Sequence, residues 1–275
     1  MADEAVIHLP ALKWRAGSVT IADDCLAVEE PLEMRLGGRR FTLTMRTPGH
    51  DEELAAGFML AEGFIAVRSE LGEIRRLRDR KGTPEPNAID IILNVPAASL
   101  AESLQRNFVV SSSCGVCGKT SIEAIERRIP PVTSQLRVRA ATLLRLPSLM
   151  RAGQATFAAT GGLHAAALFR VDERGEAELI VLREDVGRHN AVDKVIGYAV
   201  MREQVPLRGA ILMVSGRLSF EIVQKAAAAG LALVAAVSAP SSLAVGLADE
   251  LDITIVAFLR EEKFNVYTRR ERVIV

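Results

Sequence analysis

The chain contains few cysteines and has no excess of either charge. Its three cysteines in 275 residues are odd in number and too few for a disulfide framework, which indicates a reducing compartment. With 34 acidic and 34 basic residues the formal net charge is zero, so no global field would recruit nucleic acid or anionic lipid. No apolar run approaches the roughly 20 residues that span a bilayer, and the acidic N-terminus does not resemble a signal peptide. We therefore expect a cytoplasmic protein that binds neither nucleic acid nor membrane.

The sequence also lacks internal repeats and low-complexity segments, and its first hundred residues predict a mixed α/β unit. Residues 33–45 alternate around Gly37-Gly38, which is typical of a tight hairpin. An amphipathic helix is expected from Asp51 to near Gly63. Extended segments follow at 73–77 and 88–95, and a short helix at 98–105.

The second half of the chain alternates regularly between strands and helices. A short helix at 140–150 precedes a hairpin, 165–171 with 178–183, and a helix at 190–203. Strands at 210–215, 231–238 and 253–259 then alternate with helices at 220–229 and 242–251, and their continuous apolar runs indicate burial on both faces. This order predicts a three-layer α/β/α domain with a mostly parallel sheet. We expect an N-terminal α+β domain (1–110), a cysteine loop with a connecting helix (111–134) and a C-terminal cofactor-binding domain (135–275).

Two of the three cysteines, Cys114 and Cys117, form a C-x-x-C pair within a segment rich in serine and glycine. Such a segment favours exposure, which suits a thiol that meets a partner. A capping box at 120–123 predicts a helix at 121–128, and its N-terminus, together with Lys119, would lower the pKa of the nearby thiol. Cys25 is interpreted as a small core residue.

Four interpretations of the cysteine pair compete. One C-x-x-C supplies only two of the four ligands of a structural zinc site, and the histidines have no metal-ligand spacing. A dithiol switch would be expected after a βαβ pattern, which is absent. An inert structural pair would be buried, which conflicts with the exposure expected of this segment. The remaining interpretation is a nucleophile that carries sulfur.

Polar residues gather where predicted strands end. The segment 183–194 is the densest polar stretch of the chain and includes Glu184, Asp185, Arg188, His189, Asp193 and Lys194. Two later strand ends contribute Arg217 and Ser238. Because ligands bind at the carboxyl edge of open α/β sheets, we expect one shared pocket there, in which the arginines contact an anion. His164 opens the first strand of this domain, and a structural and a functional role for it remain equally open.

The motifs together resemble those of the formate dehydrogenase accessory sulfurtransferases, the FdhD family. The resemblance rests on S-x-C-G-x-C-G, T-G-x-x-H-A-A-A, E-D-V-G-R-H-x-A-x-D-K, S-G-R-x-S-x-E-x-V-Q-K and a closing N-V-Y-T, in family order between about residues 46 and 268. It implies a cytidine-deaminase-like second domain without zinc, hence no structural metal, and a homodimer.

The resemblance also implies an activity. Such proteins accept sulfur from a cysteine desulfurase as a cysteine persulfide and pass it to the Mo-bis(molybdopterin guanine dinucleotide) cofactor of formate dehydrogenase. Cys114 would bear the persulfide and Cys117 would assist, although the helix-terminus argument favours Cys117. The segment that would contact the cofactor comprises Phe258, Leu259, Arg260, Glu261, Glu262 and Lys263. Two carboxylates beside a phosphate-rich ligand are unfavourable, so Arg260 and Lys263 are the stronger candidates.

Two other functions stay open at this point. The protein could be a chaperone of the molybdenum cofactor that transfers no sulfur, or a dithiol oxidoreductase. Activity without Cys114 would indicate the chaperone, whereas equal dependence on both cysteines would indicate the oxidoreductase.

Overall fold

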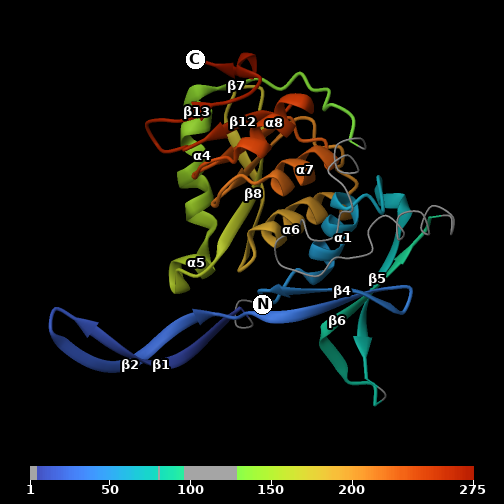
Figure 1. Ribbon diagram of the computed structural model, residues 1–275, viewed down its shortest axis with the longest axis vertical. Helices are drawn as coiled ribbons and strands as arrows, with labels where there is room; N and C mark the ends of the chain where they lie inside the picture. The colour runs from blue at the N-terminus through green and yellow to red at the C-terminus, as the bar shows by residue number, and fades with distance from the viewer. Residues whose placement is uncertain (1–4, 80, 96–128) are drawn as a thin grey trace.

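The computed structural model describes residues 5–79, 81–95 and 129–275. At its centre lies a six-stranded sheet with helices on both faces (Figure 1). The strand order is β13-β12-β11-β10-β8-β9. The strands are β8 (His164–Val171), β9 (Ala177–Asp185), β10 (Ala210–Val214), β11 (Leu233–Ala236), β12 (Thr254–Ala257) and β13 (Asn265–Val266).

The direction of these strands differs from the sequence-based expectation. The β10–β11 and β11–β12 pairs are parallel, whereas the β8–β9, β8–β10 and β12–β13 pairs are antiparallel. The expectation of a mostly parallel sheet is therefore wrong. The physical reason is that the hairpin β8–β9 joins the sheet through β8, which runs against β10 and so turns one half of the sheet antiparallel.

The predicted three layers are confirmed. Neighbouring residues of β10 belong to different buried clusters, with Leu212 and Val214 in one and Ile211 and Met213 in the other. This alternation follows from the period of two along a strand, and it shows why the run is apolar throughout. The first face is covered by α6 (Arg188–Met201), α7 (Phe220–Ala228) and α8 (Ser242–Glu250), and the second by α4 (Ala140–Gly153), which is followed by the short helix α5 (Ala155–Thr160).

A second sheet of four strands, in the order β4-β3-β6-β5, forms the N-terminal part (Figure 1). The predicted hairpin at Gly37-Gly38 is confirmed, and both glycines adopt positive φ angles. Phe41 of this sheet makes edge-to-face ring contacts with Phe58 and Phe64. The elements are β3 (Glu30–Leu36), β4 (Arg39–Arg46), α1 (Asp51–Ala61), the 3-10 turn η1 (Arg68–Glu70), β5 (Leu71–Arg78) and β6 (Pro84–Leu93).

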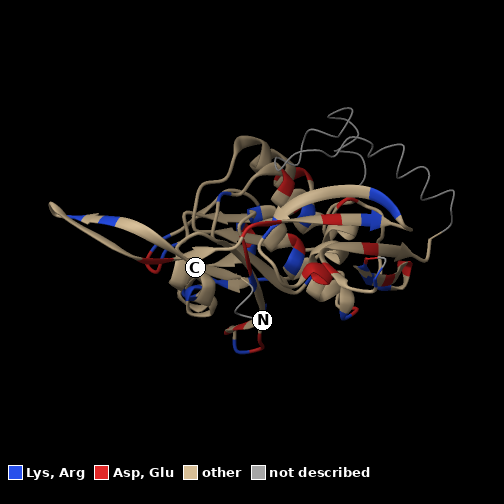
Figure 2. Cartoon of the chain, turned by 90° about the horizontal axis from the view of Figure 1, so that it is seen from below, with Lys and Arg blue, Asp and Glu red and all other residues tan. Residues whose placement is uncertain are grey.

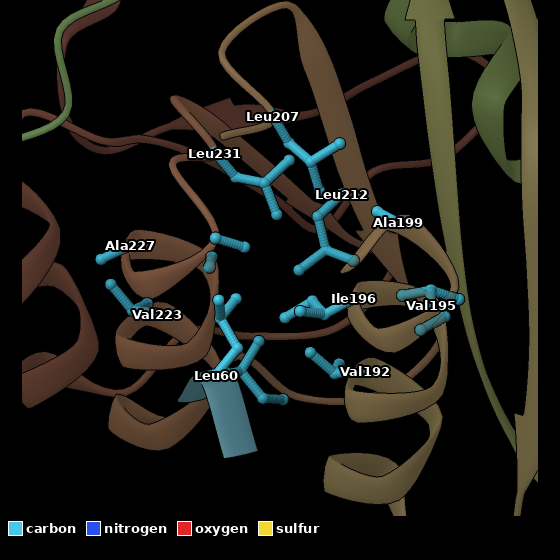
Figure 3. Packing of buried hydrophobic residues seen from close by; sticks show 14 of the residues in the cluster. Leu60, Val192, Val195, Ile196, Ala199, Leu207, Leu212, Val223, Ala227 and Leu231 are labelled. Atoms are coloured by element: carbon cyan, nitrogen blue, oxygen red, sulfur yellow. The ribbon is translucent and has the colours of Figure 1, made fainter. Parts of the chain in front are cut away.

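Helix α1 of the N-terminal part joins the helix layer of the large sheet by crossing α6 at close range. A Cβ atom added to Gly57 would lie 1.9 Å from the carbonyl oxygen of Asp193, and one added to Gly197 would lie 1.7 Å from that of Glu53. Only glycine allows the two backbones to approach this closely. Beyond the crossing, Leu60 lies among residues of α6 and α7 in the larger buried cluster (Figure 3).

A long hairpin projects from the molecule (Figure 1). It consists of β1 (Val6–Arg15) and β2 (Ser18–Ala27), which pair only with each other among the described strands, and we call it the arm. Cys25 lies on β2 with its side chain half-buried, opposite His8. The interpretation of Cys25 as a core residue is therefore wrong, because Cys25 belongs to neither of the two hydrophobic clusters that the described residues form.

The remaining described elements are short. The C-terminus returns to the start of α4, where β14 pairs with β7. These elements are β7 (Val138–Arg139), the 3-10 turn η2 (Arg270–Arg272) and β14 (Val273–Ile274). The helices expected at 98–105 and 121–128 lie outside the described residues. Across the described part of the chain, no helix is long and apolar enough to cross a membrane.

Candidate functional site

The predicted polar segments meet at one edge of the large sheet. Strands β9, β10, β11 and β12 all end there, because β9 and β10 both run antiparallel to β8 and because β11 and β12 continue parallel to β10. His164, the first residue of β8, pairs with Asp185, the last residue of β9, and so lies at the same edge. Side chains that are far apart in sequence are thus brought together.

The turn after β10 fits between two of these side chains. A Cβ atom added to Gly216 would lie 3.3 Å from Nδ1 of His164 and 3.8 Å from Cδ of Arg188. Ser215 anchors the turn to β8, because its hydroxyl accepts from the backbone nitrogen of Ala165 at 2.8 Å and its own nitrogen donates to the Ala165 carbonyl at 2.9 Å. Glycine at 216 leaves room for Arg188 to approach the edge.

Arg188 has an unmet hydrogen-bonding capacity. Its Nε atom is buried and has no hydrogen-bond partner among the described residues. A buried guanidinium nitrogen without a partner is unfavourable. An anionic ligand such as phosphate would satisfy it, since guanidinium groups bind phosphate with charge-assisted hydrogen bonds. Arg217, in the next turn, is exposed at the same edge and adds a second positive charge.

The two histidines of this edge are held neutral near pH 7. Burial, reinforced by the charges of Lys225 and Arg188, lowers the pKa of His189 to about 4. Burial and the Arg188 charge also lower the pKa of His164. Nε2 of His189 lies 3.2 Å from the hydroxyl of Ser219. The positive charge at the edge is therefore carried by arginines, and the imidazoles serve as neutral hydrogen-bonding groups.

The segment after β12 closes the edge. The backbone nitrogens of Phe258 and Leu259 donate to the carbonyls of Ser238 and Ala236, at 3.2 and 3.0 Å. The Leu259 side chain is fully buried in the second hydrophobic cluster, so it anchors the segment instead of facing the edge. The Arg260 guanidinium donates to the carbonyl of Val237 and, at 2.9 Å, to that of Leu259.

The remaining residues of that segment project outward. Phe258 is 41% exposed, and Glu261, Glu262 and Lys263 are also exposed. The two glutamates therefore stand in solvent, where their charges are screened. This placement leaves Arg260 and Lys263 available to a ligand that approaches the edge from outside.

A cavity of about 530 Å³ opens beside this edge. One side of it is formed by His164, Ser215 and Val237, and the other by helices α4 and α5. On the helical side the Arg151 guanidinium lies 4.4 Å from the centre of the Phe157 ring. The lining residues from α4, α5 and the following loop are Pro147, Met150, Arg151, Gln154, Phe157, Gly161, Gly162 and Leu163.

The sequence did not predict that helices α4 and α5 line the cavity. Only the segment 140–150 was predicted as helix, whereas α4 extends to Gly153 and α5 follows after a single residue. A signal was present, since an arginine and a phenylalanine closely precede the T-G-x-x-H motif. The sequence alone could not show that these two side chains face the strand ends.

Several polar residues of the segment 183–194 belong to the interior instead. Asp185 is fully buried and accepts from Lys194 at 2.7 Å, from the Thr47 nitrogen at 3.2 Å and from the Gly187 nitrogen at 2.8 Å. Lys194 also donates to the Thr47 carbonyl at 2.9 Å. The two residues therefore fasten the turn before α1 to α6, and they are not free to bind a ligand.

Asp193 and Glu184 have structural partners as well. Both carboxylate oxygens of Asp193 accept from Lys225 at 2.8 Å, and Glu184 accepts from the first backbone nitrogens of α5. Burial raises the pKa of Asp193 to about 6, against the attraction of Lys225. The interpretation of the whole segment as a ligand site is thus wrong for these residues. Arg188 and His189 remain as the candidate ligand-binding residues of the segment.

Cys114 and Cys117 lie outside the described residues. Within the described ranges, no group of three or more histidine, cysteine, aspartate or glutamate side chains is arranged to hold a metal ion.

Comparison with known proteins shows the family of this chain. The model of the FdhD/NarQ family matches residues 27–274. The chain belongs to the FdhD/NarQ family. Its relatives include the sulfur carrier protein FdhD of Mycolicibacterium paratuberculosis, 50% identical over 262 residues, which are 94% of this chain and 95% of the relative. The FdhD of Mycobacterium tuberculosis is 48% identical over 98% of this chain and 99% of its own.

The FdhD/NarQ relationship includes a more distant relative and a solved structure. The FdhD of Sulfolobus acidocaldarius is 40% identical over 95% of this chain and 96% of its own length. A crystal structure from Desulfotalea psychrophila, described as a formate dehydrogenase accessory protein, matches with a TM-score of 0.75 and 25% identity and covers 98% of this chain and 100% of that one. The family resemblance inferred from the motifs is therefore confirmed.

Proposed function

We propose that this protein is a sulfur carrier that takes sulfur from a cysteine desulfurase and supplies it to the Mo-bis(molybdopterin guanine dinucleotide) cofactor of formate dehydrogenase. The observation that carries the proposal is similarity along nearly the whole chain to proteins named sulfur carrier protein FdhD. The C-x-x-C pair in the sequence supplies the thiols that this chemistry needs.

The first step takes place on Cys114. Its thiolate attacks the terminal sulfur of the donor persulfide, so that a new S–S bond forms on Cys114 and the donor's S–S bond breaks. The donor cysteine leaves as a thiolate, and Cys114 becomes the persulfide. Cys117 assists as the neighbouring thiol, and the cation of Lys119 favours the thiolate form.

The cofactor is a substrate in this account, and the sheet edge fits its charged parts. The buried Nε of Arg188 has no partner among the described residues and would donate a hydrogen bond to a phosphate oxygen. Arg217, Arg260 and Lys263 surround the same edge with positive charge, and the neutral His189 offers a hydrogen bond. The cavity of about 530 Å³ beside the edge provides room for part of a nucleotide.

Labelling with sulfur tests the proposal. Wild-type protein incubated with a cysteine desulfurase and cysteine should gain the mass of one sulfur atom, located on Cys114 by peptide mass spectrometry. Cys114→Ser should gain none, and Cys117→Ser should still be labelled. Equal labelling of wild type and Cys114→Ser would reject the assignment, and complete loss of labelling in Cys117→Ser would indicate that the pair acts as a dithiol.

A further inference from the structure

The cavity beside the sheet edge is lined by a buried polar side chain that has no hydrogen-bond partner. Gln154 lines this cavity and is only 4% exposed. Its backbone nitrogen donates to the Arg151 carbonyl and its carbonyl accepts from the Ala158 nitrogen, but its side-chain amide makes no hydrogen bond among the described residues. Buried polar groups normally have partners. The amide of Gln154 therefore has both its acceptor and its donors available to a molecule in the cavity.

The wall that contains Gln154 is held in place, because the start of α5 is fastened to β9. The carboxylate of Glu184 accepts from the Thr156 nitrogen at 2.9 Å through one oxygen and from the Phe157 nitrogen at 2.7 Å through the other. The N-terminus of α5 thus has its anion within the chain and does not bind one from outside. A wall that is already fixed loses little conformational freedom when a ligand enters, which favours a specific ligand.

Arg151 supplies further donors to the same wall. Its guanidinium lies against the Phe157 ring and forms no hydrogen bond or ion pair among the described residues. A guanidinium group can only donate hydrogen bonds. None of the described residues that line the cavity is an aspartate or a glutamate, so a cationic ligand would find no counter-charge there. The wall instead suits a neutral ligand that presents an oxo group to Arg151.

The rest of the lining is apolar and suits a flat ring system. Met150 and Leu163 are buried, and Pro147, Phe157 and Val237 complete the apolar surface. The volume of about 530 Å³ lies within the range of roughly 300–1,000 Å³ that is usual for small-molecule pockets. Such pockets hold their ligands by apolar and aromatic contacts, and a few polar groups fix the orientation. The lining therefore favours a planar heterocycle over a sugar or a phosphate.

We propose that the cavity binds a heterocycle with a 2-amino-4-oxopyrimidine edge, and that Gln154 and Arg151 determine this specificity. On such an edge an oxo group, a ring N–H and an amino group lie side by side. Arg151 donates to the oxo group, as arginine does when it recognises guanine, and the Gln154 oxygen accepts from the ring N–H or the amino group. Adenine places an amino group where the oxo group stands, so that two donors would face each other without an acceptor.

This inference rests on the proposed function for its choice of ligands, because both the guanine and the pterin of the proposed cofactor carry such an edge. The cavity and the sheet edge share His164 and Ser215, and the turn at Gly216 separates His164 from Arg188. A heterocycle can therefore occupy the cavity while a phosphate of the same molecule contacts Arg188.

The long-range charge of the molecule does not select the ligand. Basic and acidic residues are interspersed over the molecule in the view of Figure 2, and the chain has 34 of each. A chain without net charge does not concentrate one kind of ion around itself. Selection among nucleotides therefore depends on the local groups that line the cavity.

The experiment measures the binding of two matched pairs of ligands to the full-length protein by isothermal titration calorimetry, without a sulfur donor. One pair is guanosine and adenosine diphosphate, and the other is free pterin and 2,4-diaminopteridine, in which an amino group replaces the oxo group. The variants are Gln154→Leu and Arg151→Met, and the matched control is Gln204→Leu, which changes an exposed glutamine. Thermal unfolding verifies that each variant folds, and Arg151 is itself exposed, so its replacement keeps the test available if Gln154→Leu is unstable.

The proposal expects wild type and Gln204→Leu to prefer the oxo member of at least one pair by about ten-fold or more. The pair that shows the preference identifies the guanine or the pterin as the group in the cavity. Gln154→Leu and Arg151→Met should lose most of the preference, whereas Arg188→Gln should weaken both nucleotides alike and keep it. Equal binding within both pairs by wild type, or an unchanged preference in the folded Gln154 and Arg151 variants, would overturn the proposal.

The outcome is separate from that of sulfur labelling. If wild-type protein gains no sulfur on Cys114, the proposed transfer fails, but the comparison of ligands remains valid because it uses no sulfur donor. If labelling succeeds and neither pair shows a preference, the sulfur carrier stands and only the assignment of the cavity is rejected.

Discussion

Asp185 and Arg188 are three residues apart, yet they have different roles. Asp185 is surrounded by donors from Thr47, Gly187 and Lys194, whereas the buried Nε of Arg188 has no partner among the described residues. A residue whose hydrogen bonds are complete contributes to the fold, and one with an unmet donor at the sheet edge is available to a ligand. Arg188 is therefore the residue on which the cofactor proposal depends most.

Replacing Arg188 should weaken nucleotide binding. We expect Arg188→Gln to raise the dissociation constant for guanosine diphosphate about 10- to 100-fold, because a hydrogen bond to a charged group contributes about 1.5–3 kcal/mol. Isothermal titration calorimetry measures the change. Arg170→Gln, an exposed residue at the far end of β8 from His164, is the control and should bind as wild type does. Equal affinity in the two variants would remove Arg188 from the site.

The sequence predicted that these residues gather at one sheet edge, but not which of them have structural partners and which are available to a ligand. The end of a predicted strand followed by a polar run sufficed to locate Arg188 and His189 at a sheet edge. It could not show that Asp185, Asp193 and Lys194 face α1 and α7, because their partners Thr47 and Lys225 are distant in sequence. Ion pairs of this kind depend on tertiary packing, which a one-dimensional pattern does not contain.

The lowered pKa of His189 predicts a pH-dependent contribution to stability. In the unfolded chain the group titrates near 6.5, and burial lowers its folded-state pKa to about 4. The unfolded state therefore binds the proton first, so the stability that neutral His189 contributes is present above pH 6.5 and is lost as the pH falls toward 4.

The substitution His189→Gln should remove this dependence of the free energy of unfolding on pH. The difference in the free energy of unfolding between wild type and variant should shift by about 1–3 kcal/mol between pH 7 and pH 4, in the direction that disfavours wild type at low pH. Urea unfolding at several pH values measures it. The raised pKa of Asp193 acts in the opposite direction, but it is present in both proteins and cancels. A constant difference across this range would show that His189 titrates normally.

Helices α1 and α6 cross at close range, and this crossing joins the N-terminal part to the helix layer of the large sheet. Gly57→Ala places a methyl group 1.9 Å from a backbone carbonyl oxygen of the facing helix, so the helices must separate. We expect a loss of about 3 kcal/mol or more in the free energy of unfolding, measured by urea denaturation. Gly246→Ala on α8 is the matched control, since its added methyl meets nothing within 4 Å. It should stabilise the protein by about 0.5–1 kcal/mol. A Gly57→Ala protein as stable as wild type would contradict the described crossing.

Other elements were predictable to different degrees. The hairpin at Gly37-Gly38 and helix α1 follow from local signals, namely two adjacent glycines and an acidic first turn. Strand direction in the large sheet does not, because nothing local states that β8 runs against β10. The arm was not predicted from the sequence, for a related reason. Strands in a projecting ribbon carry the same apolar alternation as strands in a covered sheet. Cys25 was interpreted as a core residue because a free cysteine is usually buried, and residue type alone does not show that its strand lies in a projecting ribbon.

At the scale of the whole molecule, the proposed sulfur transfer assigns separate tasks to two parts of the chain. The C-x-x-C segment would take up sulfur, and the sheet edge around Arg188 would hold the phosphates of the cofactor. Sulfur labelling tests the first task and nucleotide binding tests the second, so failure of one test leaves the other interpretable.

The most direct measurement follows labelled sulfur from one end of this route to the other. Protein carrying radioactive sulfur on Cys114 is mixed with formate dehydrogenase that contains an inactive cofactor, and the label is followed together with formate oxidation. The account predicts that the label leaves Cys114, is recovered with the dehydrogenase cofactor, and rises in step with activity. Activation of the dehydrogenase while the label stays on the carrier, or equal activation by Cys114→Ser, would contradict it.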